Sequence, residues 1–113
     1  MTPNLLIRHQ PITHEQLRQA VRDCATLLGW RVLTTQNSRG TTPGELDLRL
    51  IHRGQRRVLW AELKTGTGRL TREQQSVLAD LRAAGQEAVV WHETDWRSGE
   101  VERVLRGGLT DGA

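Results

Sequence analysis

Residues 59–78 read LWAELKTGTGRLTREQQSVL, and this stretch joins an apolar strand to a helix through a glycine-containing loop. Side chains alternate between the two faces of a strand, so Glu62 and Lys64 project from the same face. The helix is expected to begin at Thr71, because Thr71 and Gln74 have the spacing of a capping box. Two charges on one face of an apolar strand need polar partners nearby.

A preceding strand over residues 46–51 is expected to pair with this one through a turn over residues 52–56 that contains Gly54. In that pairing Asp47 lies beside Glu62, on the face opposite the leucines. Two buried like charges are costly unless a cation lies between them, and Mg²⁺ or Mn²⁺ with oxygen ligands fits. The leucines expected to share the core face are Leu46, Leu48 and Leu50.

The helix that follows Thr71 presents one apolar face, and Gln74 lies near the centre of it. A glutamine that points at the sheet needs a polar partner there. Alternatively, Gln74 only closes the capping box with Thr71. We expect that one side chain cannot easily fill both roles at once. The apolar positions of this helix are Val77, Leu78, Leu81 and Ala84.

The rest of the chain predicts an α/β fold with the element order α-β-β-β-α-β-α. A first helix begins with Thr13 and Gln16 as a capping box and stops at Gly29. A hairpin followed by a β-α-β crossover gives a mixed sheet of about four strands flanked by helices. The first helix has apolar positions at Leu17, Ala20, Val21, Cys24, Leu27 and Leu28. The strands are expected over residues 30–36, 46–51, 58–64 and 87–92, and a last helix after Ser98.

The length of 113 residues fits a single domain, residues 1–113, without an internal linker. Residues 1–12 are interpreted as an N-terminal arm and residues 107–113 as a frayed tail. The lone cysteine, Cys24, excludes an internal disulfide and a cysteine-based zinc site. No stretch is long and apolar enough for a transmembrane helix, so we expect a cytoplasmic protein without a membrane partner.

The charge balance favours nucleic acid over a membrane as the partner. There are 16 basic and 13 acidic residues, a net charge of +3, and almost all of the basic residues are arginine. Guanidinium groups bind phosphate in a bidentate manner. The alternative is an ordinary solvated surface, which the net charge alone does not exclude.

The motifs together resemble a stand-alone VRR-NUC domain of the PD-(D/E)XK nuclease superfamily, as found in small actinobacterial and phage proteins. The resemblance covers roughly residues 13–105, and it implies a restriction-endonuclease-like core. The family usually has proline where Leu46 stands, but the aspartate that follows is retained. The stretches that carry the resemblance are GELD (44–47), ELK (62–64), GRLTREQ (68–74) and Gly85.

The resemblance implies a Mg²⁺- or Mn²⁺-dependent endonuclease that hydrolyses DNA phosphodiesters. Asp47 and Glu62 would be metal ligands, with the backbone carbonyl of Leu63 as a further ligand. Lys64 would orient or activate water and offset charge in the transition state. Gln74 matches the helix glutamine that lies beside the family's catalytic site.

A glutamate on the first helix usually completes the metal site of this family. Glu15 is the candidate, but a helical wheel places it nearly opposite the apolar stripe, and His14 lies at the edge of that stripe. Either the helix has a different register, or Glu15 is a solvent-facing charge favoured by the helix dipole. In the second case His14 approaches the site instead. The remaining histidines, including His52 and His92, are too scattered to form a ligand cluster.

Small relatives of this kind cut branched DNA, including Holliday junctions, as homodimers, which implies the same partners here. The residues expected to contact phosphate are Arg8, Ser38, Arg39, Arg69 and Arg72. Two rival hypotheses remain. The chain is either a non-catalytic nucleic-acid-binding module on the same fold, or a partner protein in which Glu62 and Lys64 form only a surface ion pair.

Overall fold

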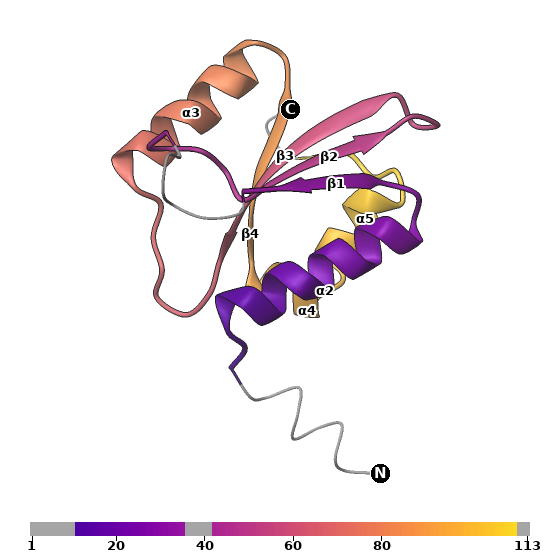
Figure 1. The fold of residues 1–113 in the computed structure, drawn as a ribbon, viewed down its shortest axis with the longest axis horizontal. Helices are drawn as coiled ribbons and strands as arrows, with labels where there is room; N and C mark the ends of the chain where they lie inside the picture. The colour runs from indigo at the N-terminus through magenta and orange to yellow at the C-terminus, as the bar shows by residue number, and fades with distance from the viewer. Residues whose placement is uncertain (1–10, 36–41, 111–113) are drawn as a thin grey trace.

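The computed structural model describes residues 11–35 and 42–110 and has the expected α/β architecture (Figure 1). A four-stranded mixed sheet in the order β1-β2-β3-β4 has α3 on one face and α2, α4 and α5 on the other. The predicted fold class is confirmed. The strands are β1 (Arg31–Thr34), β2 (Leu48–His52), β3 (Arg57–Lys64) and β4 (Glu87–His92). The helices are α2 (His14–Leu27), α3 (Arg72–Ala83), α4 (Glu93–Arg97) and α5 (Glu100–Leu105).

The pairing of the strands follows from their connections. β2 and β3 form an antiparallel hairpin, in which Leu48 pairs with Ala61 and His52 with Arg57. β3 and β4 are parallel because α3 crosses over between them, and Lys64 pairs with His92 at their carboxyl ends. The sheet therefore brings the ends of β3 and β4 and the start of β2 to one edge.

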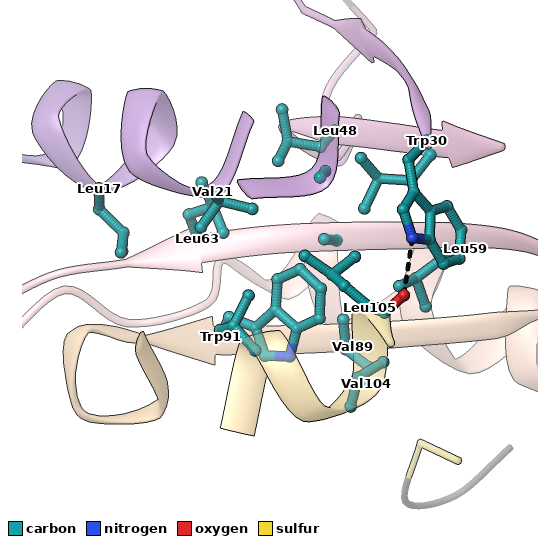
Figure 2. Packing of buried hydrophobic residues seen from close by; sticks show 14 residues of the cluster. Leu17, Val21, Trp30, Leu48, Leu59, Leu63, Val89, Trp91, Val104 and Leu105 are labelled. Atoms are coloured by element: carbon teal, nitrogen blue, oxygen red, sulfur yellow. Dashed lines mark hydrogen bonds between the residues drawn. The ribbon is translucent and has the colours of Figure 1, made fainter. Parts of the chain in front are cut away.

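The main core lies between the sheet and the face covered by α2 and α5, and Figure 2 shows its packing. The indole Nε1 of Trp30 donates to the carbonyl oxygen of Leu105 at 2.9 Å, which ties the start of β1 to the end of α5. The buried residues with no exposed surface include Leu17, Val21, Leu48, Leu50, Leu59, Ala61, Leu63, Val101 and Leu105. The buried residues of β2 and β3 in this list occupy every second position of their strands, as the strand periodicity predicted.

A second, smaller core lies between the sheet and α3, and it corrects the predicted place of Leu46. Leu46 packs with Leu78 and Ala88 in this core, whereas Leu48 belongs to the main core on the other face. The chain bends at Asp47 before β2 begins, so the strand alternation does not extend back to Leu46.

Other boundaries also differ from the prediction. Leu27 is 85% exposed and Ala84 is exposed, because both lie at helix ends beyond the part that the sheet covers. The short helix α4 was not predicted, and Ser98 caps its carboxyl end. Gly99 stands at the N-cap of α5 with a φ of 87°, a conformation that glycine adopts without strain. The predicted arm lies almost entirely outside the described residues.

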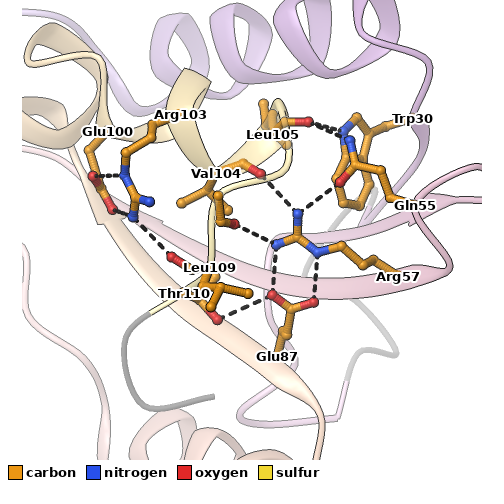
Figure 3. A network of polar contacts seen from close by, with 11 residues as sticks. Trp30, Gln55, Arg57, Glu87, Glu100, Arg103, Val104, Leu105, Leu109 and Thr110 are labelled. Carbon is orange, nitrogen blue, oxygen red and sulfur yellow. Dashed lines mark hydrogen bonds and ion pairs between the residues drawn. The ribbon is translucent and has the colours of Figure 1, made fainter.

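A polar network around Arg57 anchors the segment after α5 (Figure 3). The Arg57 guanidinium forms a bidentate pair with Glu87, at 2.9 and 2.7 Å, and donates to the carbonyls of Val104 and Gly108. The Thr110 hydroxyl also donates to Glu87, and Thr110 is only 7% exposed. The predicted fraying of the tail was therefore wrong from Gly107 to Thr110, and the last three residues lie outside the described part.

Replacing Arg57 by Ala is expected to lower the free energy of unfolding by about 3 kcal/mol, because it leaves the largely buried Glu87 carboxylate without its cation. The hydrogen bond from Arg57 holds the pKa of Glu87 below its usual value, so this stabilisation is present above about pH 4.5 and is lost on acidification. Urea denaturation at pH 7 measures the loss. Arg31→Ala, at an exposed position of β1, is the matched control. Equal stability of the two variants would show that the network does not hold the fold.

Candidate functional site

Asp47 and Glu62 lie side by side at the edge where β2 begins and β3 ends. The register of the hairpin, extended by one residue from the Leu48–Ala61 pair, sets the two acids opposite each other. The backbone N–H of Asp47 donates to Glu62 Oε1 at 3.2 Å, and the N–H of Leu63 donates to Asp47 Oδ2 at 2.9 Å. The predicted juxtaposition of the two carboxylates is confirmed.

Glu62 is a buried carboxylate, with only 3% of its side chain exposed. Its Oε2 lies 3.0 Å from Nζ of Lys64, and the Lys64 side chain is 16% exposed. The hypothesis that these two residues form only a surface ion pair is therefore wrong. A carboxylate is kept inside a fold in this way only where its hydrogen bonds and counter-charge are supplied.

Gln74 fills both of the roles that we expected to exclude each other. Its carbonyl Oε1 accepts a hydrogen bond from the backbone N–H of Thr71 at 3.0 Å, which closes the capping box of α3. Its amide Nε2 donates to Glu62 Oε2 at 2.9 Å. The two ends of one amide thus start the helix and orient the carboxylate, so the expectation of a conflict was wrong.

Burial is the main cause that raises the pKa of Glu62, and the nearby Asp47 carboxylate raises it further. The hydrogen bond and charge of Lys64 act in the opposite direction. The site therefore holds more negative charge than Lys64 offsets. A second cation placed among these oxygens would relieve that excess.

His14, rather than Glu15, reaches the acids from the first helix. His14 Nε2 lies 3.1 Å from Asp47 Oδ2. Glu15 is paired with Arg18, its side chain is 64% exposed, and the Arg18 hydrogen bond lowers its pKa. The capping box of Thr13 fixes the helix so that Glu15 faces solvent. The structure thus does not bring the candidate ligand Glu15 to the carboxylates, and it supports the alternative with His14.

The donor atoms fit a hard divalent ion in their chemistry, although they do not form a complete ligand set. Asp47 and Glu62 offer carboxylate oxygens, which Mg²⁺ and Mn²⁺ prefer, and the two carboxylates lie next to each other with Lys64 as the nearby ammonium group. Within residues 11–35 and 42–110, no group of three or more His, Cys, Asp or Glu side chains is spaced to hold a metal ion. A role for the Leu63 carbonyl stays a prediction.

The predicted phosphate-binding residues are only partly described. Arg69, in the loop after β3, and Arg72, in the first turn of α3, are exposed, and neither forms a hydrogen bond or ion pair within the described part of the chain. Arg8, Ser38 and Arg39 lie outside the described residues. The two described arginines stand on the segment that joins Lys64 to Gln74.

The sequence reading missed a cavity of about 440 Å³ at the carboxyl ends of β3 and β4. One pattern in the sequence could have indicated this cavity. The two strands that were expected to be parallel end in Lys64 and His92, and both of these side chains can donate a hydrogen bond. The cavity is lined by Lys64, Gly66, His92, Glu93 and Thr94.

No helix in the described part of the chain is long and apolar enough to cross a membrane. Comparison of the sequence with protein-family models, and comparisons with curated proteins and with solved structures, find no match. The function is therefore inferred from the residues of the site itself.

Proposed function

We propose that the protein is a divalent-metal-dependent DNA endonuclease that hydrolyses phosphodiester bonds. The observation that carries this proposal is the buried Glu62 carboxylate, which is held between Asp47, Lys64 and Gln74 at the edge of the sheet. A stable core has no need for two neighbouring carboxylates and an ammonium group. Perturbed titratable groups collected at one edge of a sheet are typical of catalytic sites.

Each residue has a defined role in this proposal. Asp47 and Glu62 would hold Mg²⁺ or Mn²⁺, with the Leu63 carbonyl as a further ligand. When bound, the ion would supply a water of lowered pKa and offset charge on the phosphate. Lys64 donates to the attacking water or to a phosphate oxygen, where negative charge develops in the transition state. Gln74 keeps Glu62 oriented through its amide hydrogen bond.

The substrate in this proposal is branched DNA, cut by a homodimer that carries one site in each subunit. The net charge of +3 and the exposed Arg69 and Arg72 support binding to a phosphate backbone. One small domain has little surface to read bases, so recognition of backbone shape is favoured over recognition of sequence. A two-fold dimer would place two sites for two symmetric nicks.

Competition between a four-way junction and a linear duplex of the same sequence tests the substrate. We expect the junction to be cut preferentially when both are present at equal phosphate concentration with Mg²⁺ or Mn²⁺. Equal cleavage of the two DNAs would overturn the preference for branched DNA but not the nuclease assignment. The products should also appear as paired, symmetric nicks on a denaturing gel.

A second candidate is a non-catalytic nucleic-acid-binding module. The lack of a complete metal-ligand set among the described residues favours it. The two candidates differ in one result: a binding module retains DNA without cutting it in Mg²⁺ or Mn²⁺, and EDTA leaves that binding unchanged.

A further inference from the structure

The cavity beyond Lys64 lies at the carboxyl ends of the two parallel strands. β3 ends at Lys64 and β4 ends at His92, and these two residues are register partners. Ligands of α/β sheets commonly bind at the carboxyl ends of parallel strands. Lys64 lines the cavity and also contacts Glu62, so this residue links the cavity to the carboxylate site.

His92 is placed to act in this cavity. Its side chain is 53% exposed and follows the same face of the sheet as Lys64. The backbone N–H of His92 donates to Asp95 Oδ2 at 2.8 Å, and the ring Nδ1 lies 3.6 Å from the same oxygen. The second distance is too long for a direct hydrogen bond, but it sets the Nδ1 edge toward Asp95. The Nε2 atom has no protein partner within residues 11–35 and 42–110.

The donors around the cavity suit an anion. Lys64 lines the cavity while its ammonium group pairs with Glu62, so the donor that the cavity itself adds is the ring N–H of His92, which is present in either protonation state. The one acidic lining residue, Glu93, is paired with Arg97 at 2.9 Å, so its charge is offset. The Gly66 backbone borders open space, which lets an extended ligand approach the loop after β3.

We propose that this cavity is a subsite for a DNA phosphate next to the one that is cut, and that His92 donates to that phosphate through Nε2. The inference rests on the proposed nuclease function and deepens it. Asp95 holds the backbone of His92 through the N–H and lies beside the Nδ1 edge of the ring. Because Lys64 both lines the cavity and pairs with Glu62, the proposal puts it between the two phosphates, and the register of the DNA strand in the cavity would then set which bond is cut.

The test is His92→Ala, with Arg53→Ala as the matched control. Arg53 lies in the exposed turn between β2 and β3, at the opposite end of β3 from Lys64, so its loss reports on general electrostatics. The Ala variant keeps the backbone N–H bond to Asp95, so the fold is retained, and the thermal midpoint should match that of the wild type. We expect His92→Ala to raise KM about tenfold with little change in kcat, the scale of one charge-assisted hydrogen bond. Arg53→Ala should change KM less than twofold.

A scan of single methylphosphonates around the cut site then identifies the phosphate. In the wild type, an uncharged methylphosphonate at one position beside the cut should raise KM about as much as the His92→Ala substitution does. The same methylphosphonate should cause no further loss in the His92→Ala variant. Identical scan profiles for the two proteins, or an unchanged KM in the variant, would overturn the subsite. A wild type that cuts no DNA would instead overturn the proposed function.

Discussion

Asp47→Asn is expected to abolish DNA cleavage while the fold remains intact. Asparagine has the same size and keeps an oxygen that accepts the hydrogen bond from the Leu63 N–H. What it removes is the negative charge that would hold a divalent ion beside Glu62. We expect the single-turnover rate to fall by more than about a hundredfold, the scale on which loss of one transition-state interaction acts.

The matched control for this substitution is Asp80→Asn. Asp80 is an exposed carboxylate on α3, and its loss changes the net charge by the same amount. The two variants should have the same circular dichroism spectrum, and their thermal midpoints should differ by no more than a few degrees. If Asp47→Asn cuts DNA at the wild-type rate, the assignment of the metal site to this edge of the sheet is wrong.

Glu62→Gln is expected to stabilise the protein in the absence of metal, although it should also abolish cleavage. Burial and Asp47 raise the pKa of Glu62, so the ionised form is disfavoured in the fold. The stability linked to a raised pKa is present at low pH and is lost as the pH rises through the folded-state pKa. At pH 7 burial and Asp47 therefore disfavour the charge of Glu62 more than Lys64 favours it. We expect removal of this charge to outweigh the loss of one hydrogen bond from the donors that meet Glu62, so that a neutral amide increases the unfolding free energy by about 1 kcal/mol.

Two further measurements separate this cause from a simple packing effect. The advantage of Glu62→Gln should shrink as the pH falls toward 4.5, because the wild-type carboxyl then becomes protonated. Saturating Mg²⁺ or Mn²⁺ should stabilise the wild type, by about 2.7 kcal/mol at a hundred times Kd, and leave the variant unchanged. Glu73→Gln, exposed in the first turn of α3, is the control. A variant less stable than the wild type at pH 7 without metal would contradict the account.

Much of the fold follows from local patterns that the sequence displays directly. The capping boxes of Thr13 and Thr71 fixed two helix starts, and strand β4 was predicted with its observed bounds. The hairpin register placed Asp47 beside Glu62, because a short turn leaves few ways to pair two strands. Local physics dominates at these points, and so they could be predicted.

The predictions failed where tertiary contacts decide the outcome. The bend at Asp47 sends Leu46 to the opposite face from Leu48, and no period-two pattern marks such a bend. The five-residue helix α4 is too short for a clear helical period. Gln74 was expected to contact either the backbone of Thr71 or a polar group of the sheet. Its amide contacts both Thr71 and Glu62, and this depends on how α3 approaches β3.

The first helix shows the same limit within the site. A helical wheel placed Glu15 toward solvent and His14 at the edge of the apolar stripe, and the structure confirms both positions. The distance between His14 and Asp47 cannot be predicted from a helical wheel, because it depends on how α2 packs against the sheet. Tertiary structure supplies this information.

The most direct test of the account is DNA cleavage by the wild type and by Lys64→Ala, each with Mg²⁺, with Mn²⁺ and with EDTA. Lys64 is the only lysine in the chain, so mapping an amine-directed label to Lys64 rather than to the α-amino group also reports on whether DNA covers this side chain. We expect cleavage of a four-way junction by the wild type with either metal, none with EDTA, and none by Lys64→Ala under any condition. Cleavage by Lys64→Ala at the wild-type rate, or an inert wild type that binds the junction with both metals, would contradict it.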